Sequence, residues 1–385
     1  MSDRGDVIHG ASSAVVAGAL RDRDPLPGTR GFAGVLAEPP GRRGPVLVRD
    51  VLGRQPLFVD RGADRPVGSG AWGFDPTGLA DPVSVPAGSV VSNERSVAEA
   101  ERVWSLPTTD PADPPAAQAA VDDAVTGALA DLGADDEGRL AVAFSGGVDS
   151  GLVASAVPDV PCYVAGFEGC HDVTAARSAA EEMRLDVRVV EITHDDLRRV
   201  IPEIAAATGR RNPMDLNIAV PLYLTAEAAV VDGFDRLAVG QGADELFGGY
   251  DKIVEPGDDH RVDADTVRGA RAETVRTLPA QLERDVLALR AAGVEPVAPL
   301  LDDRVVEAAL RLPETLLATT TDRKVALRRT ATGRVPESVW TADKKAVQYG
   351  TYVAREIERL ARQNGFKRRM DDHVGQYIES LLATY

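Results

Sequence analysis

From residue 139 onward, short apolar runs alternate with segments in which apolar residues recur at helical spacing. The apolar runs predict buried strands over residues 139–145, 161–168, 186–193 and 235–242. Helical spacing follows over residues 149–157, 172–183, 195–209 and 219–233. This alternation predicts an α/β fold, a parallel sheet with helices on both faces. Ligands of such sheets bind at the carboxyl ends of the strands.

The first hundred residues follow a different pattern. Short alternating runs broken by Gly and Pro over residues 30–105 predict hairpins and a small β-rich layer. Residues 107–115, "PTTDPADPP", predict a stiff linker, and residues 116–133 have the spacing of a helix. After about residue 260 the pattern is mostly helical. We therefore expect two domains, over residues 1–108 and 112–385.

Charge and composition narrow the classes of partner. The 385-residue chain carries a formal net charge of −17, spread along its length, which disfavours nucleic-acid binding. Two cysteines are too few for a disulfide framework. No apolar run of about 18 residues occurs, and the N-terminus has acids where a secretory signal has lysines, so we expect a cytoplasmic protein without a membrane span. A homodimer is one open alternative for its assembly.

Lysine is scarce, and Asp is more frequent than Glu. An acidic, lysine-poor surface favours a halophilic source, where salt screens the repulsion between like charges. A GC-rich genome that favours Arg and Ala codons is the alternative explanation.

The segment "FSGGVDS" joins the first strand of the alternating region to its first helix. Gly146 and Gly147 allow the backbone to turn sharply and to approach a ligand. Free N–H groups and the positive end of the helix dipole then form an anion site, to which the serines add hydroxyl groups. Asp149 would repel a phosphate unless it binds Mg²⁺ that bridges to the phosphate oxygens. The lysine of the ordinary NTPase phosphate loop is absent.

This segment resembles the pyrophosphate loop of the ATP pyrophosphatases, which split ATP into AMP and pyrophosphate. A second segment, "VGQGADELFGGY" at residues 239–250, resembles the asparagine synthetase branch of that superfamily. Further matches follow in order: "VAGFEGCHDVTAA", "ERDVLALRAAGVEPVAPLLD", "KVALRR", "PESVW" and "DKKAVQYG". The resemblance covers residues 112–365 and implies an adenine nucleotide alpha hydrolase-like fold.

The resemblance also implies roles for individual residues. Pyrophosphate would be held by Ser145, Gly146, Gly147, Asp149 and Ser150. The AMP pocket would be lined by Phe144, Ala165, Gly166, Val239 and Gly240. Asp149 and Asp244 would bind Mg²⁺, while Lys324 and Lys344 would neutralise charge on the α-phosphate and the leaving pyrophosphate. Adenylyl transfer relies mainly on positioning and charge stabilisation, and these residue types supply both.

Two positions in the resembling region depart from the family. Asparagine synthetases carry a glutamate at the position of Gln241, where it is thought to accept a proton from ammonia, and β-lactam synthetases carry a tyrosine. Glutamine cannot act as a base, although it can orient ammonia or polarise the acyl-adenylate. Val297 replaces a usual arginine. The acceptor is therefore open between aspartate and another carboxylate.

The N-terminal region resembles the N-terminal-nucleophile glutaminases through "VLVRDVLGRQPLFV". Those enzymes need a cysteine exposed at the processed N-terminus, where this chain offers Ser2, while Cys162 and Cys170 lie far away in the sequence. Serine attacks an amide less readily, so we expect a shortened, degenerate glutaminase-like domain without glutamine hydrolysis.

These features together predict an ATP- and Mg²⁺-dependent ligase that adenylates a small carboxylate such as aspartate and forms an amide with ammonia. Ammonia would arrive free or from a separate partner. The alternatives are a related ligase with a different acceptor and a nucleotide-binding pseudoenzyme, against which the intact Asp149 and Asp244 argue.

Overall fold

The computed structural model describes residues 5–68, 70–134, 138–342 and 349–384 of the chain. The chain divides into two compact units. Unit 1 comprises Met1–Ala128, Gln241–Val286 and Ala298–Thr330, and unit 2 comprises Leu129–Gly240, Leu287–Val297 and Ala331–Tyr385. The predicted domain boundary between residues 108 and 112 stays a prediction, because these units are defined by packing and each draws on separated parts of the chain.

Unit 2 is built on a five-stranded, wholly parallel sheet. Across the sheet the strands are β11 (Val187–Glu191), β10 (Cys162–Gly166), β9 (Leu140–Ala143), β12 (Arg236–Ala238) and β13 (Glu295–Val297). The chain therefore adds strands to one side of β9 and then returns to the other side. In open α/β sheets the crevice at such a reversal, at the carboxyl ends of the strands, is where ligands bind.

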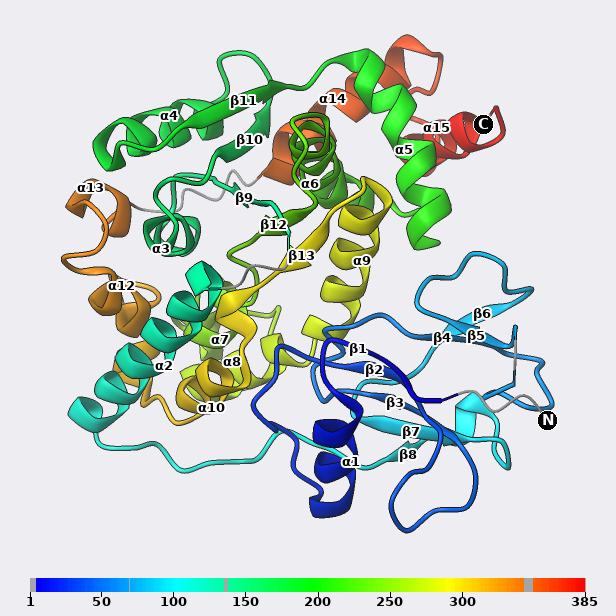
Figure 1. Cartoon of the computed structure of the whole chain (residues 1–385). Helices are drawn as coiled ribbons and strands as arrows, with labels where there is room; N and C mark the ends of the chain where they lie inside the picture. Colours follow the sequence, from blue (N-terminus) through cyan, green and yellow to red (C-terminus); the bar gives the residue numbers. More distant parts are fainter. Residues whose placement is uncertain (1–4, 69, 135–137, 343–348, 385) are drawn as a thin grey trace. The chain divides into compact units, whose positions relative to one another are not determined.

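Helices cover both faces of this sheet, as predicted (Figure 1). On one face α3 (Val148–Ala156) and α4 (His171–Met183) contact the strands, and α6 (Pro213–Val231) packs on the other face. The remaining helices of unit 2 are α5 (His194–Thr208), α13 (Glu337–Trp340), α14 (Tyr349–Gln363) and α15 (His373–Leu382). The α/β fold class is confirmed.

Helix α6 is apolar on most of its circumference because neighbours surround it. By length and composition it is the one helix among the described residues that could cross a membrane. Half of its most apolar window is buried, and it packs against α5, α14 and β10. A core helix accounts for this composition. The helix begins at Pro213 rather than at residue 219, after an Asn212 side chain that caps Asp215 N–H at 2.9 Å.

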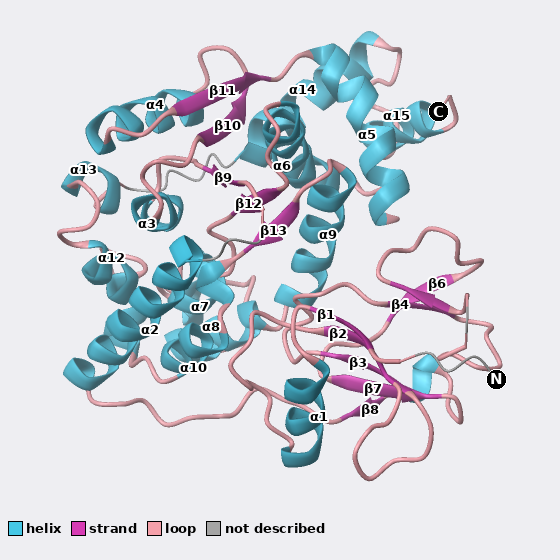
Figure 2. Cartoon of the chain, viewed as in Figure 1, coloured by secondary structure: helices cyan, strands magenta, loops and turns pink. Residues whose placement is uncertain are grey.

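The first part of unit 1 consists of antiparallel strands, as predicted. One sheet has the order β1 (Val7–His9), β2 (Ala33–Leu36), β3 (Val46–Arg49), β7 (Ser89–Ser92) and β8 (Glu101–Arg102), with α1 (Ser13–Asp22) in the same part of the chain (Figure 2). A smaller sheet has the order β5 (Trp72–Gly73), β4 (Phe58–Asp60) and β6 (Pro82–Ser84). Apolar side chains from both sheets form one buried cluster.

The rest of unit 1 is mainly helical, as predicted for most of the chain after residue 260. Its helices are α7 (Ala243–Phe247), α8 (Val267–Val275), α10 (Asp303–Leu310), α11 (Glu314–Leu317) and parts of α2 (Pro114–Ala134), α9 (Leu278–Ala291) and α12 (Val325–Ala331). The linker prediction was wrong at its end, because α2 already begins at Pro114. Proline lacks the N–H that a first helical turn leaves unbonded, so it fits there.

Candidate functional site

The glycine-rich loop lies at the carboxyl end of β9, the central strand of unit 2. Gly146 has a φ of 77°, in the left-handed region that glycine tolerates. A Cβ at this position would lie 2.9 Å from the Ala175 carbonyl oxygen on α4. Gly147 is the N-cap residue of α3, so the helix starts immediately after the loop. The sequence therefore builds a close backbone turn at the start of a nine-residue helix, as expected of an anion cradle.

Ser150 makes hydrogen bonds within this loop. Its hydroxyl accepts the Ser145 N–H at 3.1 Å and donates to the Gly147 carbonyl at 3.2 Å. The two serine hydroxyls are 3.2 Å apart. The structure thus gives Ser150 a role in shaping the loop, whereas its predicted contact with pyrophosphate stays a prediction. Asp149 lies in the first turn of α3.

The end of β12 lies against this loop within unit 2. A Cβ at Gly240 would be 3.0 Å from Asp149 Cβ and 3.2 Å from Ser150 N, so a larger residue would push against the start of α3. Val239 donates its N–H to the Val297 carbonyl at 2.9 Å. Val239 and Gly240 therefore follow β12 as Phe144 and Ser145 follow β9. These neighbouring strands lie on the two sides of the chain reversal.

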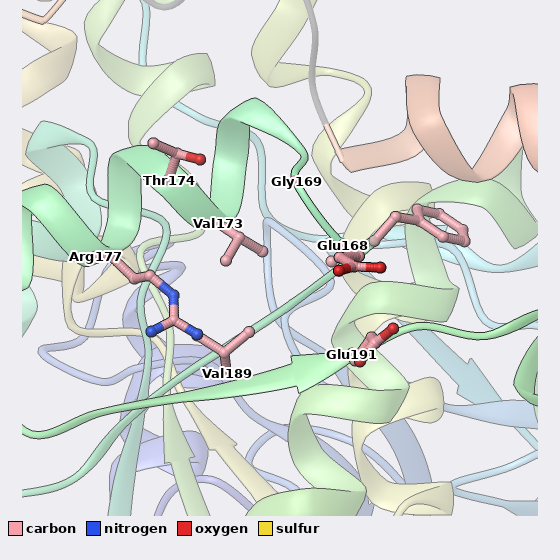
Figure 3. Close-up of a pocket in the computed structure, with 9 residues that line it drawn as sticks. Glu168, Gly169, Val173, Thr174, Arg177, Val189 and Glu191 are labelled. Carbon is pink, nitrogen blue, oxygen red and sulfur yellow. The ribbon is translucent and has the colours of Figure 1, made fainter.

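The AMP residues predicted on β10 lie at the end of the adjacent strand. Ala165 and Gly166 are buried, and a Cβ at Gly166 would be 2.6 Å from Val173 Cγ2. Gly166 also lines a pocket of about 260 Å³. Figure 3 shows Arg177 pointing from α4 toward Val189, with the carboxylates of Glu168 and Glu191 at the other end. Of the predicted AMP residues, the structure brings Gly166 to this pocket.

The remaining predicted site residues with described positions belong to unit 1. Lys324 Nζ lies 2.6 Å from Asp244 Oδ1, so the structure brings this predicted cation and carboxylate together. Lys324 is buried and has a φ of 56°, an uncommon conformation for a residue with a side chain. A Cβ at Gly249 would overlap both Asp244 Oδ1 and Lys324 Cε. The second glycine of "FGGY" is therefore needed to make room for the ion pair.

Glu245, next to Asp244, is buried and accepts a hydrogen bond from Tyr250. Burial raises the pKa of Glu245, and the hydrogen bond that the Tyr250 hydroxyl donates to it at 2.5 Å acts in the opposite direction. Glu245 is thus tied to Tyr250 at the other end of the motif, and the pair stabilises the turn that follows α7.

Gln241, the position that departs from the family, donates its Nε2–H to Asp285 Oδ2 at 2.6 Å. Asp285 Oδ1 accepts a hydrogen bond from Arg284 Nε at 2.7 Å. Both residues belong to the matching segment "ERDVLALRAAGVEPVAPLLD", for which the sequence analysis predicted no function. Nothing in the sequence links residues 241 and 285, because their contact depends on how α9 packs.

Four residues named in the sequence analysis remain: Lys344, Ser2, Asp149 and Asp244. Lys344 and Ser2 lie outside the described residues. Asp149 belongs to unit 2 and Asp244 to unit 1, so their convergence on one Mg²⁺ ion stays a prediction. Within the described ranges, no group of three or more His, Cys, Asp or Glu side chains could enclose a metal by itself.

The arginines of residues 46–59, the segment that resembles the glutaminases in sequence, make their contacts within unit 1. Arg49 is 2% exposed and donates to the carbonyls of Gln55, Gly53 and Val85 and, at 3.1 Å, to Glu283 Oε2. Arg54 binds Asp50 Oδ1 at 2.8 Å and Asp303 Oδ1 at 2.7 Å. These arginines serve internal ion pairs within unit 1.

Comparison with known proteins identifies the family. The sequence model described as asparagine synthase matches residues 120–274 and 255–373. A Methanocaldococcus jannaschii protein assigned as a glutamine-hydrolysing asparagine synthetase is 27% identical over 286 residues, 64% of this chain and 52% of that protein. Asparagine synthetase B of Escherichia coli is 24% identical over 193 residues, 44% of this chain and 33% of that protein. The chain thus spans about half the length of the first of these relatives, or less for the second.

Two solved structures show weak likeness. The U34-tRNA thiolase NcsA from Methanococcus maripaludis has a TM-score of 0.31 at 12% identity, over 70% of this chain and 81% of that chain. The NH3-dependent NAD synthetase from Campylobacter jejuni has a TM-score of 0.31 at 10% identity, over 70% and 93%. Neither likeness is high enough to indicate a shared activity. The family match covers well over half of the sequence and contains both glycine-rich motifs, and the chain belongs to the asparagine synthase family.

Proposed function

We propose that this protein is an ATP-dependent ligase that adenylates a small carboxylate, aspartate first among them, and passes the acyl group to ammonia. The products are an amide, AMP and pyrophosphate. The observation that carries the proposal is the coincidence of the family match with the glycine-rich loop at the chain reversal of the parallel sheet.

The loop residues supply the binding of the triphosphate. Backbone N–H groups of Gly146 and Gly147 and the start of α3 attract the β- and γ-phosphates. The buried ends of β9, β10 and β12 hold the nucleoside through backbone groups and exclude water. Gly240 can lie against Asp149 because it lacks a Cβ, and it precedes Asp244 by four residues in the sequence. This tether supports the proposal that both aspartates serve one cation.

The donor set fits magnesium. Mg²⁺ is usually bound by one or two carboxylates together with phosphate oxygens, which agrees with two aspartates and no larger cluster among the described residues. Asp244 already attracts the Lys324 ammonium group, so its surroundings suit a cation. When bound, Mg²⁺ would neutralise charge on the phosphate oxygens.

Adenylation then proceeds by positioning. A substrate carboxylate oxygen forms a bond to the α-phosphorus, the bond between the α-phosphorus and the bridging oxygen breaks, and pyrophosphate leaves with the electron pair. In the second step the lone pair of the nitrogen nucleophile forms a bond to the acyl carbon. The bond from that carbon to the AMP oxygen breaks, and the surplus proton on nitrogen passes to water.

A second candidate, a related ligase with another acceptor, is favoured by one observation. Val297 offers its carbonyl to Val239 and is 6% exposed, so it presents no charge to the side-chain carboxylate of aspartate. Arg49 and Arg54, in the segment that resembles the glutaminases, are bound to carboxylates of the same chain. We therefore also propose that the nitrogen comes from free ammonia or a separate supplier rather than from glutamine. A cytoplasmic location belongs to the same proposal.

The experiment that tests the proposal is incubation with ATP, Mg²⁺ and a panel of small carboxylates, with ammonium chloride or glutamine as nitrogen source. AMP, pyrophosphate and amide would be measured by mass spectrometry. We expect carboxylate-dependent AMP, amide with ammonium, and no glutamate from glutamine. AMP that appears with another carboxylate but not with aspartate would establish the second candidate. A chain that makes no AMP with any carboxylate would overturn both.

A further inference from the structure

Gln241 and Asp285 form a buried polar pair within unit 1. Asp285 is 6% exposed, and its Oδ2 accepts the Gln241 Nε2–H at 2.6 Å. Its other oxygen accepts from Arg284 Nε at 2.7 Å, which holds the carboxylate plane in place. Gln241 is only half-buried. Asp285 is thus the inner member of the pair, and Gln241 is the more exposed one.

This contact fixes which way the glutamine amide faces. A carboxylate accepts hydrogen bonds and cannot donate one when it is ionised, whereas a glutamine amide has a donating and an accepting end. If the Gln241 amide were reversed, its oxygen would face Asp285 Oδ2 and two acceptors would repel each other. The Nε2 end is therefore held at Asp285. The Oε1 end has no hydrogen-bond partner among the residues that the structure describes.

We propose that Asp285 is a positioning residue for the amide-forming step, because it holds Gln241 so that the amide oxygen Oε1 accepts an N–H from the nitrogen nucleophile. This inference rests on the proposed function and adds a residue to it. It also explains how a chain without an acid at position 241 can still orient an amine.

The pair limits the class of nucleophile. Amide oxygen orients an N–H group but takes no proton from it at neutral pH. The nitrogen must therefore enter as a neutral amine with a free lone pair. That lone pair forms the C–N bond, AMP leaves with the electrons of the C–O bond, and the proton on nitrogen passes to water. Weakly basic amines such as hydroxylamine suit this site better than ammonium, which is mostly protonated at neutral pH.

A swap of the two side-chain types tests the orientation without any substrate. Asp285→Asn lets the Gln241 amide face either way, and Gln241→Glu places two carboxylates against each other. In the double variant Gln241→Glu/Asp285→Asn, the amide at 285 donates to the carboxylate now at 241. We expect the Tm of Gln241→Glu to fall by roughly 2–4 °C or more, and the double variant to recover most of that loss.

Kinetics then separate positioning from folding. With the carboxylate panel and either hydroxylamine or ammonium chloride, we expect Asp285→Asn to lower the ratio of amide to AMP by about fivefold to tenfold, the value of one hydrogen bond. Carboxylate-dependent AMP formation should stay within about twofold. In the double variant the pH profile of amide formation should gain an ionisation that wild type lacks, because a carboxylate at 241 can accept a proton.

The matched control is Glu283→Gln, which makes the same carboxylate-to-amide change two residues earlier in α9. Glu283 is equally buried, but it binds Arg49 and, at 2.6 Å, Ser84 rather than Gln241. Glu283→Gln should lower the Tm and leave the ratio of amide to AMP unchanged. An unchanged ratio in Asp285→Asn, or the same change in both variants, would overturn the inference. Wild-type protein that makes no AMP would instead overturn the proposed function.

Discussion

The glycine-rich loop of unit 2 lies inside the family match, whereas the arginine-containing segment of unit 1, residues 46–59, lies outside it. The two also differ in the partners of their polar groups. In the loop, Gly146 and Gly240 allow backbone to lie close to backbone, and Gly147 is the N-cap residue of α3. In the segment, Arg49 and Arg54 are buried and bound to carboxylates of the same chain. The polar groups of residues 46–59 are therefore used in contacts within the chain, although the segment resembles a motif in sequence.

The difference shows where the functional information resides. Residues that bind a substrate have donors or acceptors that the folded chain itself does not use. Residues that stabilise a fold have their donors and acceptors bonded to other groups of the chain. Arg54 connects two segments of unit 1, because it binds Asp50 in its own segment and Asp303 and the Leu301 carbonyl, at 2.8 Å, in the other. The arginine-containing segment therefore joins the β-rich part of unit 1 to the start of α10, which gives it a structural role.

The largest effect is expected from Arg54→Met. Removal of the guanidinium leaves Asp50 and Asp303 buried without their cation, which typically costs about 3–5 kcal/mol of unfolding free energy. Urea unfolding followed by circular dichroism would measure it. Arg61→Met is the control, because the Arg61–Asp81 pair is more than half exposed and should contribute at most about 1 kcal/mol. Equal effects for the two variants would contradict the structural role of Arg54.

The next effect tests the loop. Asp149→Asn keeps the size of the side chain but removes the charge that is proposed to bind the cation. We expect AMP formation to fall by about 10²- to 10³-fold, the range for loss of one electrostatic stabiliser. The Tm should stay close to that of wild type. Loss of AMP formation in a variant that still folds would also exclude a non-catalytic pseudoenzyme. Asp159→Asn, in the exposed connection after α3, should leave AMP formation unchanged.

Gly249→Ala sharpens the comparison inside unit 1. The added methyl group would overlap Asp244 Oδ1 and Lys324 Cε, so the ion pair or the backbone must move, at about 1–3 kcal/mol. Tm and AMP formation should fall together. Gly257→Ala is the control, since a Cβ there meets nothing within 4 Å. An intact Tm with lost AMP formation would show that the pair acts in turnover alone.

Much of the sheet in unit 2 was predictable because buried parallel strands are continuous apolar runs. β9, β10, β11 and β12 all fall inside predicted strand ranges, and α3, α4 and α5 begin one residue before their predicted starts. β13 (Glu295–Val297) was missed, because three residues with a central proline give no strand signal and only pairing with β12 creates it. α1 and the start of α6 were missed although Ser12 and Asn212 are readable caps.

The site was predictable only as far as local chemistry reaches. The adjacent Gly146 and Gly147 predict a tight turn from local sequence alone, and Asp149 near them indicates a cation site. The Gln241–Asp285 and Arg49–Glu283 contacts join residues 44 and 234 positions apart. Their existence depends on the side of α9 that faces each partner, which no local pattern encodes.

The smallest effect is expected inside the loop itself. Ser150→Ala removes the hydroxyl that accepts from Ser145 N–H and donates to the Gly147 carbonyl, for about 1 kcal/mol net. The loop should keep its glycine-determined path, so AMP formation falls only severalfold through a higher KM for ATP. Hydrogen exchange at Ser145 N–H should accelerate. Ser155→Ala removes a similar bond to the Leu152 carbonyl in the same helix and should leave both quantities unchanged. A Ser150→Ala protein as inactive as Asp149→Asn would show that the loop depends on a side chain for its phosphate contact, and the contrast with the arginine-containing segment would disappear.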